Sequence, residues 1–335
     1  MKGLLGSGEL IEIARLYYDK QKTQQEIAER LGISRSTVSR QLDKARRLGI
    51  VRIQIINDTE ELNDLAWELE TRFGLRRAFV APSSEDEPEH TVKRNIGIAA
   101  ASCIPRFIRQ NDIVGVAWGS TLYEVFENLK NLSPDSALKI SVVQLIGAVG
   151  EMVDNTHANE VARSAAAAFG GDWYLLPAPG VCAGKSARDM FFHEPSVKRV
   201  IEMGKRANVA IISVGACHPS SIMVSSGYAT AREISILRER GAIGDTCCRF
   251  YDAQGRPVKS DIDSRTLGIR LEDLRKVPLK IVIAGGLMKA HALVGAIRGG
   301  YCDILITDQI AAMEMLRILR EIKLTSAGNL LAKCP

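Results

Sequence analysis

The sequence lacks the features that mark membrane and secreted proteins. No run of 18 apolar residues occurs, so no segment is long enough to be expected to cross a bilayer as a helix. The start, MKGLLGSGELIEIARLYYDK, has no uninterrupted apolar stretch followed by a small-residue cleavage site. We therefore expect a cytoplasmic protein with no membrane partner.

Familiar catalytic and metal-binding motifs are also missing. The seven cysteines form no C-x-x-C pair, and the five histidines are scattered along the chain. Neither a G-x-S-x-G nucleophile elbow nor a G-x-x-x-x-G-K-[ST] phosphate loop occurs. The sequence predicts buried, reduced cysteines, no metal, no cofactor and no catalytic residues.

The charge is unevenly distributed. The whole chain holds 44 basic and 39 acidic residues, and the first 57 residues hold 11 and 6 of them. The remaining residues are therefore balanced, and the net charge of +5 resides in the N-terminal sixth. This distribution is typical of a module that binds a polyanion, attached to a neutral domain.

Residues 23–55 have the pattern of two short helices followed by a strand. Thr23 and Glu26 form a capping box at the start of the first helix, and Gly32 is suited to the left-handed conformation that ends it. Ser34 is the expected cap of the second helix. The following VRIQII alternates apolar and polar residues as a strand does.

The spacing of the two helices is that of a helix-turn-helix. A small residue, Ala28, stands where the helices would touch, and Val38 would anchor the second helix in the core. With the strand as a wing, residues 1–57 are predicted to form a small winged helix-turn-helix domain. The alternative is a solvated helical hairpin whose charges serve solubility.

The predicted DNA contacts lie mainly on the second helix. Hydroxyls and arginines at its start would enter the major groove, where Arg can bind guanine through two hydrogen bonds. Basic residues further along, with Lys22 and Arg52 at the flanks, would contact phosphates. The predicted DNA-binding residues are Thr23, Ser34, Arg35, Ser36, Thr37, Ser39, Arg40, Gln41, Lys44, Arg46 and Arg47.

Three further segments follow the first domain. Residues 58–90 are predicted to be a linker helix and an exposed loop, and the helix could pack on the body or pair with its copy in another subunit. Residues 91–320 alternate apolar strands with helices, which is typical of a doubly wound parallel sheet. Residues 321–335 are a C-terminal tail. The apolar stripe of the linker helix consists of Leu62, Leu65, Leu69 and Phe73.

Ligands of such sheets bind at the carboxyl ends of strands, so small or polar residues that directly follow a strand are candidate contacts. VAWGST places Gly119, Ser120 and Thr121 at the start of a helix, where backbone N–H groups can bind an anion. IAGGLMK places Lys289 one turn into a helix after a glycine pair, where the lysine could cover a bound phosphate.

Two other side chains are candidates with open alternatives. Gln144 lies inside an apolar strand and needs partners, which could be a ligand hydroxyl or neighbouring backbone. Asp245 would repel a phosphate, so it would bind sugar hydroxyls, unless it is simply a turn aspartate. The weaker candidates, each of which could be a helix cap or a solvated charge, are Asn159, Glu160, Lys185 and Asp308. His218 is the most reactive-looking histidine, and its alternative is a polar histidine of a loop.

The ordered succession of motifs resembles the sugar-responsive transcriptional regulators of the SorC family. The motifs are TQQEIAERLGISRSTVSRQLDKAR, VAWGSTL, VVQLIGAVG, GAIGD, RFYDAQG and IAGGLMKAHALVGAIRGGYCDILITD, and the resemblance covers roughly residues 10–320. It implies an α/β fold in which the winged helix-turn-helix precedes a larger effector domain, itself similar to sugar-phosphate isomerases and deaminases.

The resemblance also implies a function. Such proteins are tetrameric regulators of carbohydrate or polyol catabolism genes, and a phosphorylated sugar or polyol controls their affinity for operator DNA. By motif match, Ser120 and Thr121 would fall in the phosphate loop, Asp245 in the sugar-contacting turn and Lys289 on the phosphate-side helix. The competing hypothesis is an isomerase- or deaminase-like enzyme with a basic arm, for which Asp245 and His218 are the available acid–base pair.

One position departs from the pattern of the family. Some relatives carry a basic residue two positions after the site of Gln144, where it can pair with a second phosphate or form a Schiff base. This chain has Ile146 there. We therefore expect a monophosphorylated ligand that is held without a covalent bond.

Overall fold

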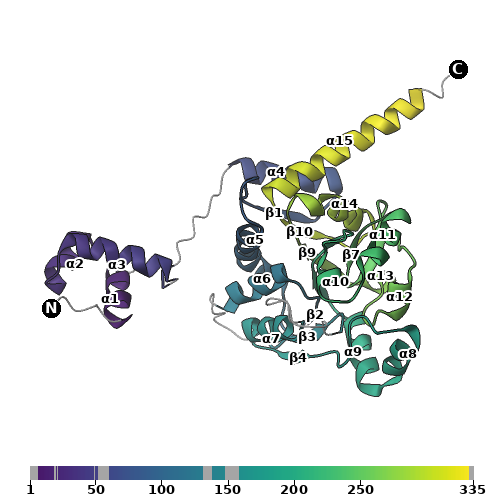
Figure 1. Cartoon of the computed structure of the whole chain (residues 1–335), viewed down its shortest axis with the longest axis horizontal. Coiled ribbons are helices and arrows are strands. Elements are labelled where there is room, and N and C mark those ends of the chain that lie inside the picture. Colours follow the sequence, from purple (N-terminus) through teal and green to yellow (C-terminus); the bar gives the residue numbers. More distant parts are fainter. Residues whose placement is uncertain are drawn as a thin grey trace. The chain divides into compact units, whose positions relative to one another are not determined.

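A computed structural model describes residues 7–18, 20, 22–48, 50–51, 60–130, 138–147 and 158–331. They form two compact units, Met1–Asn57 and Asp58–Pro335 (Figure 1). Within the described residues, no helix is both long and apolar enough to cross a membrane.

The described residues of the first unit form three helices, and caps in the local sequence account for the ends of two of them. The helices are α1 (Ser7–Tyr18), α2 (Gln24–Leu31) and α3 (Arg35–Arg47). The predicted capping box is present, since the N–H of Glu26 donates to Thr23 Oγ1 at 3.2 Å and the N–H of Thr23 donates to the Glu26 carboxylate at 2.8 Å. Gly32 is left-handed (φ 65°), and Ser34 caps α3 by accepting from the N–H of Thr37 at 3.1 Å.

A small apolar core joins these helices. Ile13 of α1, Ile27 of α2 and Val38 of α3 are almost completely buried. Leu42, on the same side of α3, completes the face predicted to point inward. Of the predicted wing VRIQII, only Val51 is described, so the wing and Arg52 lie outside the described residues.

The second unit is built on a seven-stranded parallel sheet. Its strand order is β1-β10-β9-β5-β2-β3-β4. The strands are β1 (Arg77–Ala81), β2 (Ile113–Val116), β3 (Ser141–Gln144), β4 (Asp172–Tyr174), β5 (Val209–Ile212), β9 (Leu279–Ile283) and β10 (Ile304–Asp308). From β2 the chain proceeds towards one edge through β3 and β4, and from β5 towards the other through β9 and β10. The sheet is thus doubly wound, with its switch point between β2 and β5.

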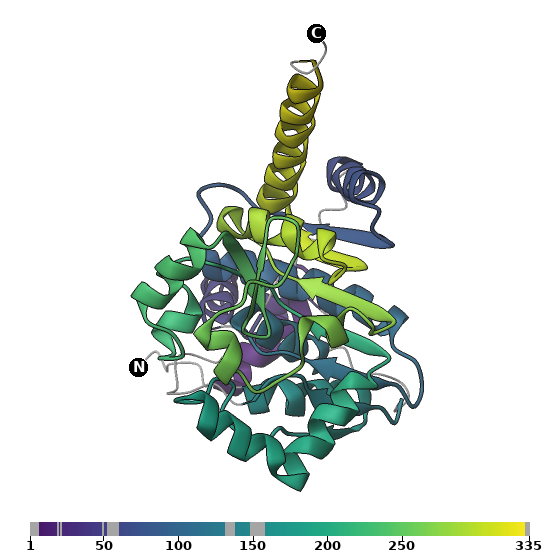
Figure 2. The ribbon, with the colours of Figure 1, turned by 90° about the vertical axis from the view of Figure 1, so that its right-hand side faces the viewer.

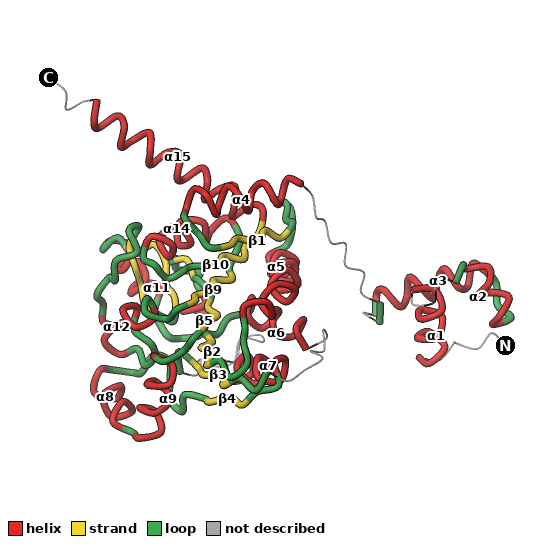
Figure 3. The backbone as a smooth tube through the Cα atoms, turned by 180° about the vertical axis from the view of Figure 1, so that it is seen from behind, coloured by secondary structure: helices red, strands yellow, loops and turns green. Residues whose placement is uncertain are grey.

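Helices cover both faces of this sheet. Figure 3 shows α5, α6 and α7 on one face and α9 and α14 on the other. The helical segments are α4 (Glu60–Phe73), α5 (Glu89–Cys103), η1 (Ile104–Phe107), α6 (Ser120–Lys130), α7 (Ala158–Phe169), α8 (Lys185–His193), α9 (Pro195–Lys205), α10 (Ile222–Ser225), α11 (Ala231–Glu239), α12 (Asp261–Arg265), α13 (Leu271–Leu274), η2 (Leu287–Lys289), α14 (Ala290–Arg298) and α15 (Gln309–Leu331).

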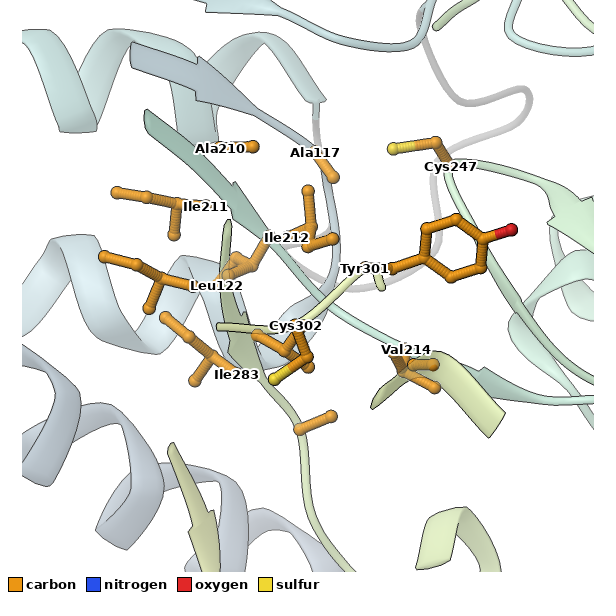
Figure 4. Close-up of a cluster of buried hydrophobic side chains, with 14 of the residues drawn as sticks. Ala117, Leu122, Ala210, Ile211, Ile212, Val214, Cys247, Ile283, Tyr301 and Cys302 are labelled. Carbon is orange, nitrogen blue, oxygen red and sulfur yellow. The ribbon is translucent and has the colours of Figure 1, made fainter. Parts of the chain in front are cut away.

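The core between the sheet and the helices is predominantly apolar. Ile211 of β5 and Ile283 of β9 lie on the face of the sheet on which Leu122 of α6 packs, and Ile212 of β5 points to the opposite face (Figure 4). All four side chains are completely buried. The six described cysteines are buried and free, which confirms the expectation of reduced thiols for them.

A second, antiparallel sheet was not anticipated from the sequence. It consists of β6 (Gly215–Ala216), β7 (Ala242–Thr246) and β8 (Arg249–Asp252). Cys247 and Cys248 form the two-residue turn between β7 and β8, with φ of 50° and 56°. Asp245 therefore lies inside β7 rather than in a turn.

The segment 58–90 also differs from its prediction. The helix α4 is present and packs on the body, with Leu62 and Leu69 buried. Residues 77–81, however, form the edge strand β1 of the main sheet rather than part of a linker. The tail predicted from residue 321 is not separate either, because α15 continues to Leu331.

Candidate functional site

A cavity of about 650 Å³ lies at the carboxyl ends of the parallel strands. Residues that follow β1, β2, β5, β9 and β10 line it, together with residues of the β7–β8 hairpin. It therefore surrounds the switch point, the position at which doubly wound sheets bind ligands. Five of the six predicted effector contacts line the cavity: Gly119, Ser120, Thr121, Asp245 and Lys289.

The turn between β2 and α6 forms one wall. Gly119 has a φ of 150°, a conformation that residues with a side chain rarely adopt, and it leads directly into α6 at Ser120. The first N–H groups of a helix have no acceptor within the helix and carry its positive end. Ser120 and Thr121 thus bring the first N–H groups of α6 and two hydroxyl groups to one place, which is suited to an anion.

Lys289 forms a second part of the wall, at a slightly different position from that predicted. It is the last residue of the 3₁₀ turn η2 and directly precedes α14, because Gly286 (φ 89°) and the turn occupy the space between strand and helix. Burial lowers the pKa of Lys289, and the nearby Lys93 lowers it further. An anionic ligand beside Lys289 would stabilise the charged form of its side chain.

Asp245 is the buried acid of the cavity. It pairs with Gly215 across β6 and β7, and a Cβ atom on Gly215 would lie 2.3 Å from Asp245 Oδ1. The glycine therefore makes room for the carboxylate. Burial raises the pKa of Asp245 to about 6, although Lys289 and the N–H of Cys248 oppose this. Near neutral pH the group can accept a hydrogen bond from a ligand hydroxyl, and below about pH 6 it can donate one.

This pKa leads to a stability prediction for Asp245→Asn. Because the folded-state pKa lies above the ordinary value of 3.8, protonation favours the folded state. The contribution of Asp245 to the free energy of unfolding is therefore fully present below about pH 4 and is lost as the pH rises through about 6, by about 2–3 kcal/mol. The neutral amide avoids this loss, so the ligand-free variant should be more stable than the wild type at pH 7.5, with a smaller difference at pH 5.

Urea denaturation of both proteins at the two pH values measures this difference. Asp64→Asn, an exposed residue on α4, is the matched control and should show no pH-dependent difference. A constant stability difference between the Asp245 variant and the wild type would show that the buried carboxylate does not titrate in this range.

Gln144 lies outside the cavity wall formed by the described residues. Its Oε1 accepts from the N–H of Leu176 at 2.7 Å, and its Nε2 donates to Asn159 Oδ1 at 2.9 Å. Both ends of the amide are therefore bound by the protein. These two hydrogen bonds favour a structural role for Gln144, in which the side chain connects β3 to neighbouring segments.

The weaker candidates separate into two groups. His218 lines the cavity, and its Nδ1 accepts from the N–H of Ser220 at 3.2 Å. Asp308 also lines it and caps the first turn of α15. By contrast, Glu160 pairs with Arg163, and Lys185 begins α8.

Sequence reasoning missed several polar residues of the cavity. Ser213 directly follows β5, so the strand-end rule could have identified it. Residues of the segment 82–93 gave no such signal, because the strand β1 before them had not been predicted. The missed residues include Ser83, Ser84, Glu89, Lys93, Ser213, Ser220 and Ser221.

The other candidate site is the exposed face of α3. Val38, Leu42 and Ala45 face the core, while Arg35 and Arg40 are exposed. Among the described residues, neither of these arginines forms an ion pair with a carboxylate, so both cations are available to a polyanion. Arg40 Nε donates to the backbone oxygen of Ser36 at 3.3 Å, which holds its guanidinium along the helix.

Three predicted DNA-binding residues already have structural roles, and one of them is Ser34, the cap of α3. Arg46 Nε donates to the hydroxyl of Tyr18 at 2.9 Å and so braces α3 against α1. Thr23 caps α2, as described above. These contacts fix the position of α3 within its unit.

Comparison with known proteins agrees with the division of the chain into two units. The sequence profile of the sugar-binding domain family matches residues 57–317. The chain belongs to this family. A second profile, sigma-70 region 4, matches residues 12–48, which contain α2 and α3. The sugar-binding domain therefore corresponds to the second unit and follows a helix-turn-helix.

Relatives with this domain match over nearly their whole length. The deoxyribonucleoside regulator of Bacillus subtilis is 36% identical over 310 residues, covering 92% of this chain and 97% of that protein. The sorbitol operon regulator of Klebsiella pneumoniae is 31% identical over 308 residues, with coverage of 92% and 97%. The crystal structure of the full-length sorbitol operon regulator SorC superposes with a TM-score of 0.74 at 30% identity, covering 92% of this chain and 99% of that one.

These similarities confirm both the resemblance to SorC-type regulators and the predicted fold class. The relatives are transcriptional regulators, so the chain is a regulator with a sugar-binding domain rather than an enzyme.

Proposed function

We propose that the chain regulates genes of carbohydrate or polyol catabolism and that a phosphorylated sugar or polyol, bound in the strand-end cavity, controls its affinity for operator DNA. The observation that carries the proposal is the arrangement of charge in the cavity. A helix N-terminus and Lys289 provide a site for an anion, and the buried Asp245 provides a partner for hydroxyl groups within the same cavity.

The cavity supports a monophosphate that is held without a covalent bond. Ile146, at the position where some relatives carry a basic residue, lines the cavity and is 1% exposed. An apolar side chain there offers neither a cation for a second phosphate nor an amine for a Schiff base. Gly119, Ser120, Thr121 and Lys289 would bind the phosphate, and Asp245 the sugar hydroxyls.

DNA binding is assigned to residues 1–57 and effector binding to the second unit. The exposed start of α3 would enter the major groove. Operator half-sites lie one helical turn of DNA apart, about 34 Å, or a multiple of it, so two recognition helices are needed. We therefore propose that the protein is a homo-oligomer, specifically a tetramer, in the cytoplasm. The effector changes DNA affinity by favouring one arrangement of the subunits over another.

Thermal shift with a panel of pentose, hexose and hexitol phosphates tests the effector assignment. A phosphorylated member should raise the melting temperature, and its unphosphorylated parent should not, since binding to the folded state alone stabilises it. Turnover of a sugar phosphate by the purified protein would favour the isomerase or deaminase hypothesis. A covalent adduct trapped by borohydride would contradict the non-covalent binding mode.

A further inference from the structure

Asp308 stands at the end of β10, where α15 begins, and its side chain is completely buried. Its Oδ2 accepts from the N–H of Gly286 at 2.5 Å. Its Oδ1 accepts from Ser83 Oγ at 2.9 Å and from the N–H groups of Ile310 and Ala311 at 3.1 and 3.2 Å. One carboxylate therefore joins three separate segments around the cavity.

The first of these segments carries Lys289. A Cβ atom on Gly285 would lie 2.0 Å from Asp308 Oδ2, so the glycine pair is pressed directly against the carboxylate. Three residues after Gly286, the N–H of Lys289 donates to the Gly286 oxygen at 3.0 Å and closes the turn η2. Asp308 thus fixes the start of the turn from which Lys289 extends.

The second of these segments is the start of α15, which contacts the helix that follows the DNA-binding unit in the sequence. Asp308 caps α15, and α15 packs against α4 (Figure 2). Gln309, the first residue of α15, donates to Glu61 of α4 at 3.3 Å, and Arg320 lies 3.6 Å from Glu68. The helix α4 is the first described element after the DNA-binding unit in the sequence.

We infer that Asp308 is a positioning residue that couples the effector cavity to the helix pair α4–α15, an inference that rests on the proposed function. It binds no effector itself, because its Oδ1 already accepts three hydrogen bonds and its Oδ2 holds the glycine loop. An anion at Lys289 displaces the loop that Asp308 holds, and the same carboxylate passes this displacement to the first turn of α15 and so to α4.

Asp308→Asn separates the two ends of this connection. Asparagine has nearly the same shape as aspartate but offers one accepting oxygen and one donating NH₂ group. If its oxygen caps α15, its NH₂ group faces the N–H of Gly286 and repels it. If the amide is reversed, α15 loses its cap. Either way, the loop and the helix are no longer held by the same group.

Two further variants complete the test. Ser83→Ala removes a hydroxyl that donates to Asp308 Oδ1 and accepts from the N–H of Ile310. Asp303→Asn is the matched control, since Asp303 stands near the other end of β10, pairs with Lys280 at 2.8 Å and does not belong to the described cavity lining. It should lower stability without affecting communication.

The experiment measures DNA affinity with and without saturating 2-deoxyribose 5-phosphate or sorbitol 6-phosphate. The DNA is a duplex that the wild-type protein selects from a randomised library, and calorimetry gives the affinity for each sugar phosphate. For the wild type we expect the two DNA dissociation constants to differ by at least about 5-fold, the lower end of typical allosteric coupling.

In Asp308→Asn the ratio of the DNA dissociation constants with and without ligand should fall below about 2. In Ser83→Ala the ratio should lie between this value and that of the wild type. Asp303→Asn should keep the wild-type ratio even if its melting temperature drops. The wild-type ratio in both Asp308→Asn and Ser83→Ala would overturn the inference, and Ser83→Ala alone decides it if Asp308→Asn does not fold. If the wild type binds no member of the sugar-phosphate panel, the proposed function fails and the inference fails with it.

Discussion

Replacing Arg35 and Arg40 together with Ala is expected to abolish specific DNA binding while leaving the fold and sugar-phosphate binding unchanged. Both side chains are exposed on α3, whose opposite face holds the core of the first unit. A bidentate contact between Arg and guanine is worth about 1–3 kcal/mol. Losing two such contacts would weaken specific binding by roughly 30-fold to 10⁴-fold.

Fluorescence anisotropy with the selected duplex and with a scrambled duplex measures this loss. Arg30→Ala is the control, because Arg30 is also an exposed arginine of the first unit but lies on α2. It should reduce affinity for both duplexes slightly and about equally. Specific binding that survives the double substitution would show that α3 is not the reading helix.

Replacing Lys289 with Gln is expected to have the largest effect on effector binding. A hydrogen bond between a charged group and phosphate contributes about 1.5–3 kcal/mol, so the dissociation constant should rise roughly 10-fold to 150-fold. Without ligand, the variant should bind the selected duplex as the wild type does. Its stability should not fall, because burial lowers the pKa of Lys289 and so disfavours its charge in the folded state.

Calorimetric titration with 2-deoxyribose 5-phosphate and sorbitol 6-phosphate measures the change. The control is Lys276→Gln, because the Lys276 side chain is 75% exposed and makes only a surface pair with Asp273. That variant should bind as the wild type does. An unchanged affinity in Lys289→Gln would place the phosphate elsewhere in the cavity, or outside it.

The features that could be predicted from the sequence are those encoded within a few neighbouring residues. The caps at Thr23 and Ser34 and the left-handed Gly32 follow from local hydrogen bonding and backbone freedom, and all three are present. The strand-end rule identified Gly119 and Lys289 as cavity residues because the carboxyl ends of parallel strands meet at one edge of the sheet.

Other features depend on contacts between distant segments. The edge strand β1 has mixed burial and an apolar run of only four residues, AFVA, so its own sequence marks it only weakly as a strand. The turn at Cys247 and Cys248 has positive φ without the Gly, Asn or Asp that usually marks such turns. The apolar strand around Gln144 indicated that its amide needs hydrogen-bond partners. Which residues these are, Leu176 and Asn159, depends on how distant segments pack in the fold.

Asp308 shows the same limit within the cavity. The sequence suggested a cap or a solvated charge, and the cap is present. Its second role, as acceptor for Gly286, joins strands β9 and β10 and requires their pairing in the sheet. No local pattern could have indicated that one carboxylate holds both the loop of Lys289 and the start of α15.

The most direct test of ligand-controlled DNA binding is a titration of the selected duplex with the wild-type protein, with and without a saturating sugar phosphate that binds it. The predicted result is a change of at least about 5-fold in the DNA dissociation constant, which becomes smaller in Lys289→Gln at a ligand concentration that just saturates the wild-type protein. The contradicting result is an unchanged DNA dissociation constant at a ligand concentration at which calorimetry shows the cavity to be full.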